Sequence, residues 1–175
     1  MFRHPLSVGE EALLFTDGWL AVARLEPYRV DWRTPDGRWI RGAALPVPLE
    51  KLDGREKQAH MERRAETTGQ PTKSPDTVSG WPETIPPFAG NSIVGSRDGR
   101  LLLRHEKTAD HPETIYDVVT RRGILEGQIT MPDNERIIGF GAKSVYIVVT
   151  DDDGIQRLRR HPWPAERPIV PSRGR

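Results

Sequence analysis

The 175-residue chain contains no cysteine and no long apolar run. The first absence excludes disulfides, thiolate metal sites and cysteine nucleophiles, but it does not assign a compartment. No stretch approaches the roughly 18 apolar residues of a membrane span, so we expect none. Net charge is also nearly absent, because 26 Lys and Arg stand against 25 Asp and Glu. No overall positive field favours nucleic acid, and we expect no nucleic-acid partner.

Glycine and proline are frequent instead, with 16 of each. Such dense punctuation suits many short strands better than a helical bundle. Strand-like segments form three blocks, at residues 10–46, 88–132 and 135–161, with four, four and three predicted strands. Within the blocks, glycine turns join successive strands at Gly18, Gly37, Gly99, Gly123 and Gly154. The repetition predicts an all-β fold made of antiparallel meanders.

The third block has a gradient of polarity. Val145–Val149 is apolar throughout, as expected of a strand covered on both faces, whereas Ile155–Arg160 is mostly charged, as expected near solvent. This gradient is typical of a β-propeller blade, whose inner strands lie between neighbouring blades. A plain antiparallel sheet remains the alternative interpretation.

A segment at residues 47–80 interrupts the repetition. Residues 50–66 are rich in Glu, Lys, Arg, Gln, Ala and Met and predict a polar, exposed helix. Residues 67–79 predict a flexible loop, so we interpret 47–80 as a helical and loop insertion. Residues 162–175, with several prolines, predict a C-terminal tail.

One segment carries a resemblance to a known family. Trp81-Pro-Glu-Thr-Ile-Pro-Pro-Phe88, then Asn91–Gly99 and the apolar Arg100–Arg104, resembles the later blades of bacterial six-bladed β-propellers of the NHL/TolB-like sort. The likeness extends over most of residues 18–164. It implies the C-terminal half of a six-bladed propeller, in a family that is mostly periplasmic or located in the cell envelope. The sequence itself contains no secretion signal, and localisation stays open.

The number of blades has a physical consequence. A propeller closes with at least about four blades of about 40 residues each, and only about three fit here. An open half-ring leaves apolar faces and sheet edges uncovered. We therefore expect self-association or pairing with a separate N-terminal half.

Two acidic or histidine-rich segments are candidate metal sites. His105-Glu106 and Asp110-His111 bring four potential ligands close in sequence, but their spacing matches no zinc motif, and a solvated loop is the favoured interpretation. Asp151–Asp153 could bind calcium, yet it lacks alternate carboxylate spacing and is better explained as a charged turn. We assign no metal ligand and no cofactor.

Other candidates are also better explained as structural residues. Arginines of the strands and turns, such as Arg100 and Arg121, are typical of solvated outer strands. Ser92 and Ser144 show no nucleophile motif, and no phosphate-binding glycine pattern occurs. A groove formed by Trp39, Trp81 and Trp163 is less favoured than packing of these rings. We assign no catalytic residue.

The sequence favours a non-enzymatic binding or scaffold module of the propeller type, with a protein, peptide or glycan ligand. One alternative is part of a propeller hydrolase or lyase that takes metal or carboxylate ligands from several blades. The other is a truncated gene product without activity of its own.

Overall fold

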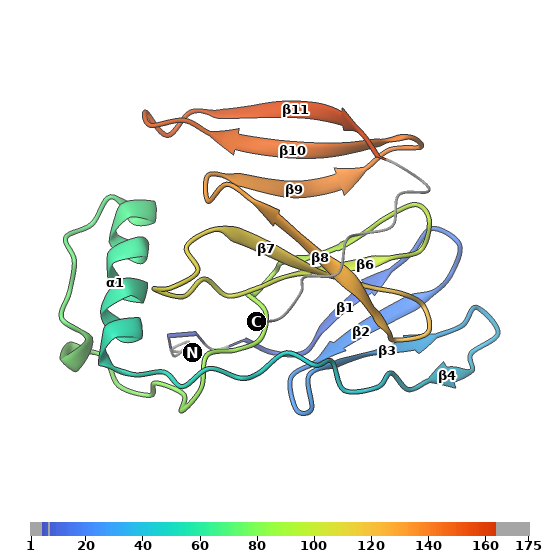
Figure 1. The fold of residues 1–175 in the computed structure, drawn as a ribbon, viewed down its shortest axis with the longest axis horizontal. Coiled ribbons are helices and arrows are strands. Elements are labelled where there is room, and N and C mark those ends of the chain that lie inside the picture. Colours follow the sequence, from blue (N-terminus) through green and yellow to red (C-terminus); the bar gives the residue numbers. More distant parts are fainter. Residues whose placement is uncertain (1–4, 7, 164–175) are drawn as a thin grey trace.

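The computed structural model describes residues 5, 6 and 8–163. It contains three antiparallel sheets and one α-helix, which confirms the predicted all-β fold (Figure 1). Sheet 1 contains β1 (Glu11–Leu14), β2 (Leu20–Arg24), β3 (Arg29–Arg33) and β4 (Trp39–Ile40). Sheet 2 contains β5 (Ile93–Gly95), β6 (Leu101–Arg104), β7 (Thr114–Val119) and β8 (Leu125–Met131). Sheet 3 contains β9 (Glu135–Phe140), β10 (Ser144–Thr150) and β11 (Gln156–Pro162). Within each sheet, strands adjacent in sequence are adjacent in space.

Five hairpin loops share one geometry, and the sequence predicts all five. They begin at Phe15, Thr34, Ser96, Thr120 and Asp151, and they end at Gly18, Gly37, Gly99, Gly123 and Gly154. In each loop the glycine N–H donates to the carbonyl of the first residue. The N–H of that first residue donates to the carbonyl of the residue after the glycine. The glycine φ angles lie between 69° and 90°, a region that costs a residue with a Cβ roughly 1–2 kcal/mol. The repeated glycines therefore mark repeated loop geometry.

The three sheets stack face to face, with sheet 2 in the middle. Leu101 and Leu103 of β6 are fully buried in one apolar cluster with sheet 1, where Trp32 is also fully buried. Leu102, between them, points the other way and packs with Val145 of β10 in a second cluster. Successive strand residues face opposite sides of a sheet, so a continuous apolar run is needed when both faces are covered. The first strands β1, β5 and β9 pack against one another in that order.

Sheet 3 differs in part from the expectation. β11 is exposed at every position, as predicted for an outer strand. β10 is only partly buried, so the strands covered on both faces are β6 and β7 of sheet 2. Ile138 and Leu158 leave 44% and 62% of their surface exposed, and the predicted self-association stays a prediction.

The predicted tail begins too early. β11 continues to Pro162, and the Trp163 ring packs 4.7 Å from that of Phe140. The remainder of the predicted tail, 164–175, lies outside the described residues.

The insertion contains the helix α1 (Gly54–Thr68) and the short 3-10 helix η1 (Pro75–Thr77). The predicted helix is thus present but starts and ends later than 50–66. Asp53 caps α1 by accepting from the Glu56 N–H at 2.9 Å, and Gly69 ends it with φ 64°. A bridge between Lys51 and Thr84 ties the start of the insertion to the segment that follows it. No helix among the described residues is long and apolar enough to cross a membrane.

Sheets 1 and 2 also touch through backbone. A Cβ added at Gly123 would lie 2.4 Å from the Gly42 Cα, closer than such atoms approach. Gly42 is equally confined, because a Cβ there would lie 2.1 Å from the Val30 carbonyl oxygen. The close approach of the two sheets therefore requires glycine at Gly123, and the backbone of sheet 1 itself requires it at Gly42.

We expect Gly123→Ala to destabilise the protein more than Gly154→Ala does. Both glycines have positive φ, but a Cβ at Gly154 meets nothing within 4 Å. Gly154→Ala should cost about 1–2 kcal/mol from backbone conformation alone. Gly123→Ala adds the clash with Gly42. Urea unfolding of the two variants measures the difference, and equal losses would contradict the close approach.

Candidate functional site

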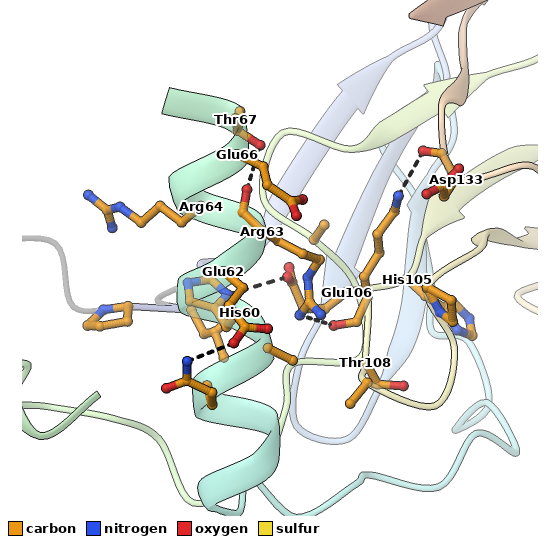
Figure 2. Close-up of a pocket in the computed structure, with 18 of the residues that line it drawn as sticks. His60, Glu62, Arg63, Arg64, Glu66, Thr67, His105, Glu106, Thr108 and Asp133 are labelled. Atoms are coloured by element: carbon orange, nitrogen blue, oxygen red, sulfur yellow. Dashed lines mark hydrogen bonds and ion pairs between the residues drawn. The ribbon is translucent and has the colours of Figure 1, made fainter. Parts of the chain in front are cut away.

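A large hollow lies between α1 and the loop 105–113 that follows β6. Its volume is about 1330 Å³. One wall is the face of α1 that carries His60 and Arg63, and the opposite wall is the loop with His105 and Glu106 (Figure 2). Asp133, from the turn before β9, closes one side. We call this hollow the α1 cleft.

Hydrogen bonds hold α1 against the loop. Both carboxylate oxygens of the buried Glu56 accept from the Ala109 N–H, at 3.0 and 2.9 Å. An Asp and a Glu at positions 53 and 56 would be expected to cap the helix reciprocally. Here the Glu56 carboxylate accepts from the Ala109 N–H of the loop instead of from the N-terminus of its own helix. Arg55 pairs with Asp110 at 2.7 Å on the exposed side.

The middle of the cleft contains a histidine and a carboxyl group, and a tryptophan packs behind the histidine, outside the lining. The Nδ1 of His60 lies 4.0 Å from Oε1 of Glu106, and the His60 ring packs edge-on against Trp81 at 5.7 Å. Figure 2 shows the Glu106 carboxylate pointing from the loop toward α1. The Trp81 N–H donates to the Pro75 carbonyl at 3.2 Å, which fixes the ring behind His60.

Burial changes the charge states of these groups. Desolvation raises the pKa of Glu106, although Arg63, Arg104 and Lys107 oppose the shift. Desolvation lowers the pKa of Lys107 and of His60, each of which is partly removed from water. A carboxyl with a raised pKa in a cleft is able to exchange protons nearer to neutral pH than a solvated one.

A buried polar cluster lies behind the loop. Asp117 of β7 is fully buried and accepts from the Tyr28 hydroxyl at 2.8 Å and from Gln128 Nε2 at 2.9 Å. The Nε2 of His105 lies 2.8 Å from the same carboxylate, although the ring is not aligned for a hydrogen bond. Burial and the charge of Asp117 raise the pKa of Tyr28 well above its usual value. Tyr28 comes from sheet 1 and Asp117 from sheet 2, so the cluster joins the two sheets.

The structure brings His105, Glu106 and His111 of the first metal candidate to one small hollow, without Asp110, and gives the four residues different partners. His105 and Glu106 line the α1 cleft, whereas Asp110 pairs with Arg55 and His111 lies 3.2 Å from Glu113. No group of three or more His, Asp or Glu side chains within residues 5, 6 and 8–163 is arranged to hold a metal ion.

The second metal candidate is a turn. Asp151 accepts from the Ile155 N–H at 2.9 Å and pairs with Arg157 at 3.0 Å. Both contacts belong to the hairpin between β10 and β11.

The remaining candidates do not form one site. Trp81 packs on His60 and Trp163 on Phe140, while Trp39 is half-exposed on β4. These positions separate the three rings that a tryptophan groove would require.

The two serines have structural partners. Ser92 donates to the Ala89 carbonyl, and the Ser144 hydroxyl accepts from Arg160 at 2.7 Å. Arginines of the strands pair with carboxylates, as Arg100 does with Glu126 at 2.5 Å.

Sequence reasoning identified the loop but missed its partners. Glu56 and Arg63 were only part of a polar helix, and Tyr28 and Asp117 were only strand residues. The one signal for Asp117 was an acidic residue inside an apolar run, Tyr116–Val119, where a charge needs a buried partner. Which residues would supply that partner depends on how the sheets stack.

Comparison with known proteins gives no match: no family model, curated protein or solved structure is significantly similar to the chain. The resemblance to six-bladed propellers therefore stays a prediction from the sequence.

We expect Tyr28→Phe to lower the free energy of unfolding by about 1–3 kcal/mol, the usual cost of leaving a buried charged acceptor without a donor. Tyr146→Phe is the control, because the described residues provide no hydrogen bond to that hydroxyl. Chemical denaturation measures both variants. Equal, small effects would show that the Tyr28 bond to Asp117 does not stabilise the sheet contact.

Glu106→Gln should stabilise the protein at pH 7. The raised pKa means that the fold favours protonated Glu106, so its favourable contribution is complete below about pH 4.5 and is lost as pH rises through the folded pKa. The advantage of the variant over the parent should therefore shrink between pH 7 and 4.5 in unfolding titrations.

Glu113→Gln is the control of opposite sign. Hydrogen bonds from its own backbone N–H and from His111 lower the pKa of Glu113. Its contribution is present above about pH 4.5 and lost below. This variant should be less stable than the parent at pH 7, and the difference should vanish in acid. The same pH trend for both variants would contradict the assignment.

Proposed function

We propose that this protein is a binding or scaffold module without catalytic activity, and that its α1 cleft holds a peptide segment of a protein ligand. We also propose that the three sheets are blades of the propeller type. The packing of β1, β5 and β9 against one another, and the burial of sheet 2 on both faces, support the blade arrangement.

The α1 cleft is the observation that carries the binding proposal. Its volume of about 1330 Å³ exceeds the roughly 300–1,000 Å³ of small-molecule pockets, which favours an extended segment. Its described lining contains no Trp, Tyr or Phe side chain on which a sugar ring would stack. A peptide ligand is therefore favoured over a glycan.

An enzyme is the second candidate, because Glu106 combines a raised pKa with a place in the cleft. In such an enzyme Glu106 would be the general acid. The position of His105 beside Asp117 supplies a second titratable group on the same loop.

Selection from a displayed random peptide library tests the proposal. Selected peptides should bind the parent protein and lose about tenfold or more in affinity for Ala59→Trp, which fills the cleft from α1. Asp152→Trp adds the same ring at an exposed hairpin turn and should bind normally.

Stable binding of intact peptides supports the module. Cleavage of bound peptides that stops in Glu106→Gln would support the enzyme. Failure to select any peptide, or equal binding to Ala59→Trp, would contradict the cleft as the binding site.

A further inference from the structure

Three half-buried cations of the α1 cleft, Arg63, Arg104 and Lys107, lack carboxylate partners in direct contact. Arg63 donates to the Lys107 carbonyl at 2.7 Å, and Lys107 Nζ donates to the Asp133 carbonyl at 2.8 Å. No hydrogen bond or ion pair engages the Arg104 guanidinium among the described residues. All three cations line the cleft and act on the pKa of Glu106, so they lie around one carboxyl group.

This arrangement differs from that of the half-buried arginines elsewhere in the described chain. Arg24 pairs with Asp31, Arg100 with Glu126, and Arg121 with Asp17. A cation that is partly removed from water usually has such a partner, because burying a charge costs free energy unless it is paired. The three cleft cations have neutral carbonyl partners or none.

The anionic groups of the cleft do not offset these cations. Glu106 is partly buried, and burial opposes its ionisation, which weakens it as a partner for the cations. Glu62 accepts from Gln58 at 2.7 Å, and Glu66 is exposed at the rim. The Asp133 carboxylate opposes the downward shift in the pKa of Lys107, and it does so more strongly than Glu106 does. Arg63 and Arg104 act in the same way on Glu106, but neither makes a direct ion pair with it.

We infer that the α1 cleft recognises an acidic peptide segment, with a ligand carboxylate lying among Arg63, Arg104 and Lys107. This inference rests on the proposed function and specifies its ligand. A guanidinium binds a carboxylate through two parallel hydrogen bonds, which gives direction as well as attraction. The partly desolvated cleft strengthens such a contact relative to a solvated surface pair.

Calorimetric titration with acetylated hexaglutamate amide tests the inference. This peptide should bind the parent protein, and hexaglutamine amide should not. Arg104→Gln should weaken binding about tenfold, the loss expected when one charged hydrogen-bonding partner is removed. Arg104→Lys should restore part of the affinity. The control is Arg97→Gln, an exposed arginine on a hairpin turn of sheet 2, which should bind normally.

Glu106→Gln supplies a test that does not depend on removing a cation. It deletes the competing carboxylate and should increase hexaglutamate affinity. In the isotope-labelled parent protein, the amide signals of Arg63 and Lys107 should shift when the peptide is added, whatever the stability of the variants.

Three results would overturn the inference: equal binding of hexaglutamine, equal weakening by Arg97→Gln and Arg104→Gln, or binding of inorganic phosphate but not of hexaglutamate. The last result would indicate a phosphoryl ligand. If library selection yields neutral peptides that need the open cleft while hexaglutamate fails to bind, the acidic ligand is wrong and the proposed function stands.

Discussion

The burial of sheet 2 on both faces is the constraint on which the rest of the structure depends. Leu101, Leu102 and Leu103 are consecutive and fully buried, so one strand contributes to both apolar clusters. Each outer sheet covers one face of sheet 2, and neither could be removed without exposing one of these clusters to water. The stacking also brings backbones together at Gly42 and Gly123, which leaves no room for side chains between the two loops.

The same stacking makes it possible to bury Asp117. A fully buried carboxylate costs free energy unless its oxygens are satisfied, and the Tyr28 hydroxyl reaches it only because sheet 1 lies against sheet 2. His105 lies against this carboxylate at the start of the loop that forms one wall of the cleft. The polar cluster thereby connects the packing of the sheets to the position of the loop. The shape of the cleft therefore depends on how the sheets pack.

Sequence patterns predicted local structure better than they predicted contacts between distant segments. The glycine turns and short apolar runs identify eleven strands because hairpin geometry depends on neighbouring residues. The apolar run Val145–Val149 predicted a strand buried on both faces, but the strand with that burial contains Leu101–Leu103. An apolar run does not show which sheet lies in the middle. The sequence indicated one wall of the cleft, because His105 and Glu106 are candidate metal ligands. It did not indicate Glu56, because the partner Ala109 is 53 residues away and is brought close only by the fold.

The helix wall of the cleft is held differently from the sheets. Met61 is the one buried apolar side chain of α1, and the helix otherwise depends on polar contacts such as those of Glu56 and Arg63 with the loop. Polar contacts of this kind contribute less to stability than apolar burial, so opening of α1 should cost less than opening of a sheet. Arg63 both holds the loop carbonyl and faces the cleft. A ligand anion that engages Arg63 therefore acts on a group that also fixes the wall, and binding and helix docking become energetically coupled.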